Sequence, residues 1–266
     1  MDAHPGVGAS TGDPSPVVLV HGIISSRYLL PMVRELARST RVLVPALPGY
    51  GPRDRVKGTP DLATQADAVA AAIVEWGVPT TTVVGHSIGA EVVVELARRH
   101  PSLVERAVLV GPTGDPHAAG VFGVWTRWMA TAVHEPLSFN LLTVAEFASL
   151  GPRRMIDVVR RSFADPIEAK LSEVRCPTLL VRGARDRVAP QAWLDRMASQ
   201  IADTVTVTLA DSAHTIVYTE SKELADLVIR FASGTEVASG LGPQGLDAEV
   251  GVVPGQEPGG RRGPVP

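Results

Sequence analysis

The sequence predicts an α/β protein in which a mostly parallel central sheet is flanked by helices and carries an inserted helical cap. Short β-branched runs alternate with helical patterns along the chain. The strand runs are apolar on both faces, which is typical of a buried parallel sheet. The 266 residues, of which 45% are hydrophobic, suit one domain with a sizeable core.

Six strands and five helices are expected to alternate. In chain order, the expected strands span residues 17–20, 42–44, 81–84, 107–110, 178–181 and 205–209, and the expected helices span 28–38, 61–76, 88–100, 190–201 and 220–233. In sheets of this kind, functional residues gather in the loops at the carboxyl ends of the strands, so these loops are where we look for a site.

The segment 112–173 interrupts this alternation. Its pattern is mostly helical, and Pro136, Pro152 and Pro166 divide it into short helices. Tryptophan and phenylalanine are concentrated here, in a chain that is only 5% aromatic. We interpret the segment as a helical cap inserted into a core formed by residues 16–111 and 174–233; extra core helices are the alternative.

Both ends of the chain are expected to be flexible. Residues 1–15 are small and polar, without the basic start and apolar stretch of a signal peptide. In residues 234–266, glycine and proline make up about two-fifths of the sequence, above the roughly 25–30% that marks unstructured segments. We expect no catalytic role for this tail.

Composition excludes several classes of function. The net charge is −3 without long runs of like charge, so neither nucleic acid nor a strongly charged partner is expected. No segment approaches the roughly 18 apolar residues of a membrane span, so we expect no membrane partner and a cytoplasmic location. The single cysteine, Cys176, excludes an intramolecular disulfide and a cysteine-based metal cluster.

The strongest motif is Gly-His-Ser-Ile-Gly at residues 85–89, between an expected strand and an expected helix. This is the context of a G-x-S-x-G elbow, whose tight turn lifts a serine hydroxyl clear of the sheet. Ser87 is the predicted nucleophile, and the Ile88 backbone N–H at the start of the helix is a predicted oxyanion donor. The second predicted donor is the Ile23 N–H, in the loop that follows the first strand.

A serine hydroxyl needs a base within hydrogen-bond reach. Of the seven histidines, His214 follows the last expected strand and lies at the same sheet edge as Ser87, so it is the predicted base. The other six are found in the flexible start, after the first strand, beside Ser87, at the far end of the next helix, or in the cap: His4, His21, His86, His100, His117 and His134. The two cap histidines face solvent or contact substrate.

The base needs an acid to hold its tautomer and stabilise the imidazolium. Asp186 ends the fifth expected strand, again at this sheet edge, and is the predicted acid. A surface ion pair with a neighbouring arginine is its alternative role. Asp115, after the fourth strand, is the second candidate, whereas Asp211 is too near His214 along the loop.

These features together resemble the α/β-hydrolase superfamily, and the resemblance covers residues 15–233. The segments that carry it are His21-Gly22, Ala46 to Gly51, Gly85 to Gly89, Cys176 to Asp186 and His214 to Glu220. The resemblance implies a helical cap over the site and hydrolysis through an acyl-enzyme without metal or cofactor. Relatives that cleave carbon–halogen bonds or epoxides use aspartate as the nucleophile, so Ser87 argues against those chemistries.

Aromatic residues of the expected cap suggest an apolar substrate. Those predicted to line the pocket are Trp125, Trp128, Phe139 and Phe147. An ester, thioester or lactone of a small hydrophobic acid fits best, and hydrolysis of a carbon–carbon bond in a diketone, or of an amide, is the alternative in the same site. The pairs Arg153-Arg154 and Arg160-Arg161 bind a carboxylate or form a solvated helix face.

A different class of function also fits the sequence, since some superfamily members keep the three residues but act as ligand receptors with little turnover. The expected partner is a small hydrophobic molecule, and the expected oligomeric state is a monomer or a homodimer.

Overall fold

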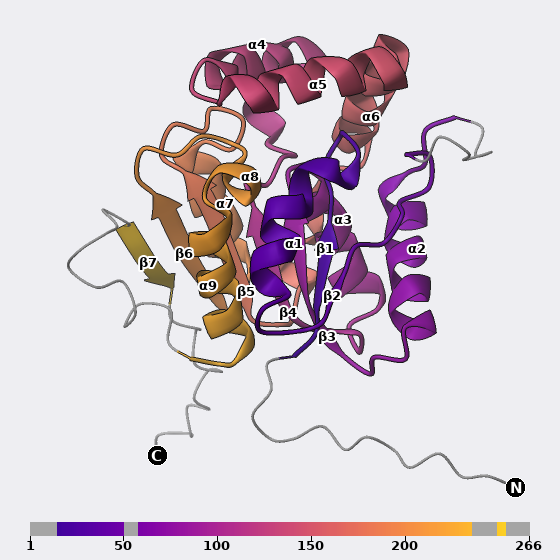
Figure 1. The fold of residues 1–266 in the computed structure, drawn as a ribbon, viewed down its shortest axis with the longest axis vertical. Coiled ribbons are helices and arrows are strands. Elements are labelled where there is room, and N and C mark those ends of the chain that lie inside the picture. Colours follow the sequence, from indigo (N-terminus) through magenta and orange to yellow (C-terminus); the bar gives the residue numbers. More distant parts are fainter. Residues whose placement is uncertain (1–14, 51–57, 236–248, 254–266) are drawn as a thin grey trace, which may run out of the picture.

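A seven-stranded sheet runs through the centre of the protein (Figure 1). The computed structural model describes residues 15–50, 58–235 and 249–253. The strand order is β2-β1-β3-β4-β5-β6-β7, and all neighbours are parallel except β6 and β7. The strands are β1 (Val17–Val20), β2 (Val42–Leu43), β3 (Thr81–His86), β4 (Val104–Val110), β5 (Thr178–Gly183), β6 (Thr204–Leu209) and β7 (Glu249–Val253).

The strand order reverses direction beside β1, because β2 lies on one side of it and β3 on the other. In open parallel sheets, a switch point of this kind leaves a crevice at the carboxyl ends of the two neighbouring strands, here β1 and β3, whose following connections run to opposite sides. The loops that follow β1 and β3 therefore meet at this crevice. Ile23 and Ser87 lie in these two loops.

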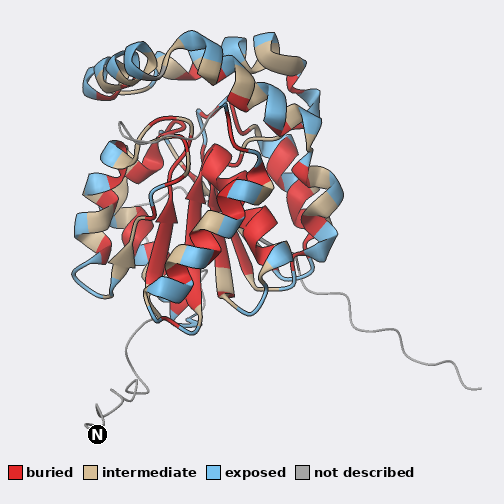
Figure 2. Ribbon diagram, turned by 90° about the vertical axis from the view of Figure 1, so that its right-hand side faces the viewer, coloured by how far each residue is buried: buried red, intermediate tan, exposed pale blue. Residues whose placement is uncertain are grey.

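Helices cover both faces of the sheet, which explains why the strand runs are apolar on both sides. Val17 and Leu19 pack into one core with α1 (Leu30–Leu36) and α9 (Ser221–Ala232). Val18 and Val20 pack into the other core, with α2 (Leu62–Glu75), α3 (Ile88–Arg99) and α7 (Gln191–Gln200). Short helices η1 (Ser26–Leu29), α8 (Ile216–Thr219) and η3 (Ile167–Glu173) complete these layers. Figure 2 shows the buried strands between the buried inner faces of the helices.

Between β4 and β5 the chain forms η2 (Pro116–Ala118), α4 (Gly120–Ala132), α5 (Leu137–Leu150) and α6 (Pro152–Ala164). We call α4, α5 and α6 the inserted helices. They lie above the carboxyl edge of the sheet (Figure 1), and much of their surface is exposed or only half-buried (Figure 2). The prolines separate them as expected: Pro136 precedes α5 and Pro152 begins α6.

The outer faces of α4 and α5 are apolar and exposed. They carry Phe122, Met129, Leu137, Leu141 and Val144, and Val133 in the turn between them is exposed as well. The charged residues between 120 and 150 are Arg127, Glu135 and Glu146, and each bonds to a partner outside these helices, namely Asp115, Thr215 and Ser25. All three are half-buried, so none of the fully exposed residues described between 120 and 150 is Asp, Glu, Lys or Arg.

The tail departs from expectation. We expected residues 234–266 to be unstructured, but Glu249–Val253 forms β7, which pairs antiparallel with β6. This segment contains three valines, a β-branched run that the glycine and proline content of the whole tail obscured. The remaining expectations for 1–14, 236–248 and 254–266 concern residues outside those described. None of the helices in the described ranges combines the length and hydropathy that a membrane span requires.

Candidate active site

Ser87 occupies the sharp turn between β3 and α3. Its φ of 58° and ψ of −125° lie where a residue with a side chain is strained. The turn is held by the Ser87 N–H, which donates to the Val110 carbonyl of β4 at 2.9 Å. The next residue, Ile88, begins α3, so its N–H belongs to the first helical turn and has no acceptor within the helix.

The two glycines of the motif are required by close backbone approach. A Cβ atom on Gly85 would lie 2.3 Å from the Gly89 carbonyl oxygen. A Cβ atom on Gly89 would lie 2.4 Å from the Val20 carbonyl oxygen. The turn can therefore pack against β1 and α3 only when both positions lack a side chain.

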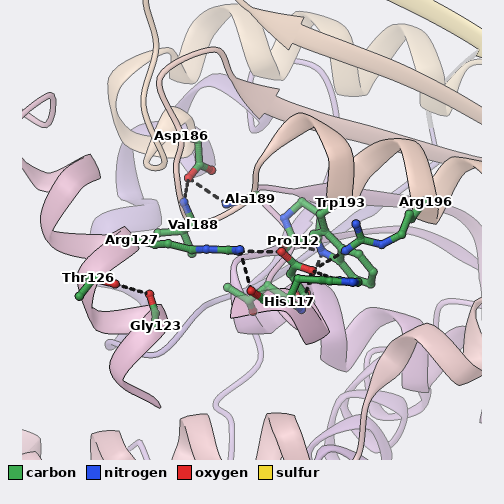
Figure 3. Close-up of polar contacts among 12 residues, drawn as sticks. Pro112, His117, Gly123, Thr126, Arg127, Asp186, Val188, Ala189, Trp193 and Arg196 are labelled. Atoms are coloured by element: carbon green, nitrogen blue, oxygen red, sulfur yellow. Dashed lines mark hydrogen bonds and ion pairs between the residues drawn. The ribbon is translucent and has the colours of Figure 1, made fainter. Parts of the chain in front are cut away.

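His214 and Asp186 are hydrogen-bonded and buried. His214 Nδ1 lies 2.8 Å from Asp186 Oδ2. The other carboxylate oxygen of Asp186 accepts the N–H groups of Val188 at 2.8 Å and Ala189 at 3.1 Å (Figure 3). One oxygen therefore anchors the carboxylate to its own loop, and the other holds the imidazole in the tautomer that leaves Nε2 free to accept a proton.

Electrostatics favour the charged pair despite the burial. Burial of Asp186 acts to raise its pKa, but His214 and the two loop amides lower it, and the net shift is downward. Burial acts to lower the pKa of His214, but the charge and hydrogen bond of Asp186 and the charge of Glu135 raise it, and the net shift is upward. The imidazole is therefore a stronger base than an isolated histidine.

A chain of hydrogen bonds that the sequence did not reveal links three loops of the site. The Gly22 N–H donates to the Tyr28 hydroxyl at 2.7 Å, and that hydroxyl lies 2.9 Å from His86 Nδ1. His86 Nε2 lies 3.0 Å from the backbone carbonyl of His214. Burial, and then repulsion from His214, lower the pKa of His86 to about 3. The neutral ring can therefore donate from Nε2 and accept from Tyr28.

Ser87 and His214 line a cavity of about 410 Å³ beneath the inserted helices. The expected pocket residues Trp125, Trp128, Phe139 and Phe147 all line it. Ile23 and Ile88, the predicted sources of the oxyanion donors, line it as well. Among the described residues of its wall there is no Asp, Glu, Lys or Arg.

Several sequence candidates lie elsewhere. Asp115 pairs with Arg127 at 2.6 Å and with Arg196, not with His214. Asp211 pairs with Arg185 at the surface. His117 is largely exposed, and the arginine pairs of α6 do not line the cavity. Within the described ranges, no group of three or more His, Cys, Asp or Glu side chains could hold a metal ion.

Comparison with known proteins assigns the family. A model of the alpha/beta hydrolase family matches residues 17–227. The chain belongs to this family. The mostly parallel sheet flanked by helices is the fold of the family, so the predicted fold class is confirmed.

Curated relatives within the family include esterases and other hydrolases. The chain is 25% identical over 251 residues to the pimeloyl-[acyl-carrier protein] methyl ester esterase of Aromatoleum aromaticum, covering 80% of this chain and 96% of that protein. It is 26% identical over 205 residues to the 2-hydroxymuconate semialdehyde hydrolase of Pseudomonas putida, covering 67% and 73%.

A solved structure, that of the N-acyl homoserine lactone degrading enzyme Est816, shares the fold. The two chains superimpose with a TM-score of 0.72 at 21% identity, over 82% of this chain and 93% of the other. The chain is thus a member of a hydrolase family whose relatives include esterases.

Proposed function

We propose that the protein is a serine hydrolase that cleaves an ester-type bond of a small hydrophobic substrate through an acyl-enzyme. The observation that carries this proposal is the pairing of an uncharged, largely apolar cavity with a serine and a buried His–Asp pair in the same site. Such a cavity binds an apolar acyl or alcohol group by burial, while Ser87 and His214 at its wall carry out the chemistry.

In the proposed mechanism, His214 Nε2 removes the Ser87 hydroxyl proton as the serine oxygen attacks the carbonyl carbon. The N–H groups of Ile23 and Ile88 stabilise the resulting oxyanion. Collapse of this intermediate breaks the ester bond, and His214 gives its proton to the leaving alkoxide. Water then attacks the acyl-enzyme with His214 again as base, releasing the acid and free Ser87.

The cavity wall argues for neutral substrates. A carboxylate inside a cavity without a cationic side chain lacks a partner, and burying an unpaired charge is costly. Carboxylic esters, thioesters and lactones with an uncharged chain fit this wall. The carbon–carbon alternative has a named relative, the 2-hydroxymuconate semialdehyde hydrolase. The name of that relative gives a muconate as its substrate, and a muconate carries a carboxylate. A carboxylate suits the described cavity wall less well, because the wall has no cationic side chain to pair with it.

The deciding experiment compares wild type with Ser87→Ala on p-nitrophenyl esters from acetate to decanoate. Loss of turnover by about 10³ or more is expected, because the nucleophile is removed. Ser199→Ala, an exposed serine on α7, is the matched control and should retain full turnover. The chain length with the highest kcat/KM then measures how much of the cavity the acyl group fills.

Two outcomes would contradict the proposal. Equal activity of wild type and Ser87→Ala would remove Ser87 as the nucleophile. A single slow turnover in wild type, with no further product, would instead favour the receptor alternative over an enzyme. Multiple-turnover kinetics at several enzyme concentrations distinguish these cases.

A further inference from the structure

Three loops of the candidate site are held by side chains that come from the inserted helices or from the turn between α4 and α5. Each of these contacts lies one or two residues from a group used in the proposed mechanism. None of the three side chains lines the cavity, so none contacts substrate.

The base loop is held by Glu135, in the turn between α4 and α5. Its Oε1 accepts the Thr215 N–H at 2.9 Å, and its Oε2 accepts the Thr215 hydroxyl. Thr215 directly follows His214 and is 2% exposed. The turn itself is fixed by Asn140, whose amide donates to the Ala132 carbonyl at 3.0 Å.

The acid loop is held by Thr131 of α4, which is 1% exposed. The Arg187 N–H, directly after Asp186, donates to the Thr131 hydroxyl oxygen at 3.0 Å. The hydroxyl proton is already committed to the Arg127 carbonyl at 2.9 Å. The hydroxyl therefore acts on the acid loop only as an acceptor.

The loop after β1 is held by Glu146 of α5. Its carboxylate accepts the Ser25 hydroxyl at 2.8 Å and the Ser25 N–H at 3.4 Å. Ser25 lies two residues after Ile23, the proposed oxyanion donor. Contacts from α4, α5 and the turn between them thus reach the acid, base and oxyanion segments separately.

We propose that Thr131, Glu135 and Glu146 are positioning residues through which the inserted helices set the geometry of the catalytic loops. The inference rests on the proposed function. The same helices supply Trp125, Trp128 and Phe147 to the cavity wall, so the elements that contact the substrate also hold the reacting groups. Substrate binding and loop geometry are therefore coupled through α4 and α5.

Glu135 also acts on the base electrostatically. The titratable groups that face His214 are Asp186 from the loop after β5, His86 from the end of β3, and Glu135 from the turn between α4 and α5. His86 is neutral above pH 4 or so because its pKa is about 3. Glu135→Gln keeps an acceptor for the Thr215 N–H but removes one of the two negative charges, so the pKa of His214 falls.

The test measures kcat and KM across pH for Thr131→Val, Glu135→Gln and Glu146→Gln on the best p-nitrophenyl ester. We expect kcat to fall by up to about 10²-fold with KM nearly unchanged, since reacting groups are misplaced while the cavity is intact. In Glu135→Gln, the acid limb of kcat/KM also moves to lower pH. Thr131→Ser keeps the acceptor and restores activity.

Matched controls make the same changes away from the loops. Thr126→Val alters an exposed threonine of α4 that bonds only within its helix (Figure 3), and Glu75→Gln alters an exposed acid at the end of α2. Both should match wild type.

Failure of this inference can be told apart from failure of the proposed function. In one outcome, Ser87→Ala is inactive but Thr131→Val and Glu135→Gln match wild type in kcat and in the pH dependence of kcat/KM. Positioning by the inserted helices is then wrong, and the hydrolase mechanism stands. If Ser87→Ala keeps wild-type turnover, the proposed function is wrong. In a third outcome, Thr131→Val, Glu135→Gln and Glu146→Gln lower kcat, but Thr131→Ser does not recover it and Glu135→Gln leaves the pH dependence of kcat/KM unchanged. The contacts are then only structural.

Discussion

One carboxylate oxygen of Asp186 accepts hydrogen bonds from its own loop, and the other accepts one from His214. A substitution can therefore keep the loop contacts while reversing the direction of the hydrogen bond to His214. In Asp186→Asn, the side-chain oxygen can still accept from Val188 and Ala189. The NH₂ group then faces His214 Nδ1, which must become an acceptor, and the other ring nitrogen carries the proton. We expect turnover to fall by about 10⁴, as wrong-tautomer variants of such sites do.

The control for this prediction is Asp115→Asn, because Asp115 was the second candidate acid and lies in a separate ion-pair cluster. It should keep wild-type turnover if the fold is intact. Steady-state kinetics on the same ester, with circular dichroism of both variants, decide the matter. A nearly active Asp186→Asn would contradict the assignment of the acid.

The pH profile follows from the upward shift of the His214 pKa. The base must be neutral to accept the serine proton, so kcat/KM rises with pH as His214 loses its proton. Because the pKa is raised, the midpoint lies above the roughly 6.5 of an unperturbed histidine. Initial rates from pH 5 to 9 measure it, and a profile that is flat from pH 5 to 8 would exclude His214 as the titrating base.

At the residue scale, sequence motifs located Ser87, His214 and Asp186 because each follows a strand that could be recognised from its apolar run. The structure brings His214 and Asp186 together as expected, whereas their catalytic roles stay predictions. Tyr28 and Glu135 could not be found this way. The contact of Tyr28 with His86 spans 58 residues of the chain, and that of Glu135 with Thr215 spans 80, so no local sequence pattern indicates either pairing.

Among the elements, α3 follows the candidate nucleophile Ser87 and carries a buried acid. Glu91, one turn after Ser87, is fully buried and accepts hydrogen bonds from Thr113 and, at 2.6 Å, from Ser162 of α6. Burial raises its pKa to about 7 from an ordinary 4.5. The folded protein therefore keeps this proton at pH values where the unfolded chain has lost it.

The consequence is a loss of stability as pH rises. Between about pH 4.5 and 7, the folded state binds more protons at Glu91 than the unfolded state does, so the free energy of unfolding decreases through this window and levels off above it. The full loss is about 3 kcal/mol. Glu91→Gln is neutral at every pH and should therefore gain stability relative to wild type from pH 5 to 8.

Urea unfolding of both proteins at several pH values measures this difference, and other titrating groups cancel in the comparison. Glu75→Gln, which removes an exposed acid, is the matched control. A wild-type-minus-Glu91→Gln difference that is constant from pH 5 to 8 would contradict the prediction.

Sequence periodicity predicted the long buried strands better than the short elements. The six parallel strands were found because apolar β-branched runs mark strands buried on both faces. The helix expected at 28–38 instead begins as η1 and continues as α1, where Pro31 lies in the first turn. α8 and β7 were missed because α8 spans only four residues and β7 is embedded in a glycine-rich segment.

For the whole molecule, the exposed apolar residues of α4 and α5 predict self-association. Exposed apolar patches of monomeric proteins are usually small, and larger ones mark contact surfaces. We expect the protein to form a dimer or larger species as its concentration rises, and Leu141→Glu to return it to a monomer by placing a charge on this surface.

Sedimentation velocity across a range of concentrations tests this. Val74→Glu provides the control, because Val74 is exposed to a similar extent, 63% against 61% for Leu141, but lies on α2. It should leave the association unchanged. A wild-type protein that stays monomeric at all concentrations, or a Leu141→Glu variant that associates equally, would show that these faces are not a contact surface.

The antiparallel strand β7 has a practical consequence for anyone who shortens or tags this protein. It occupies the outer edge of β6, which otherwise presents unpaired backbone N–H and C=O groups. Such an edge pairs readily with a strand from another chain. A truncation before Glu249 would therefore leave β6 as the edge strand, without its antiparallel partner. We expect such a truncation to favour aggregation during expression.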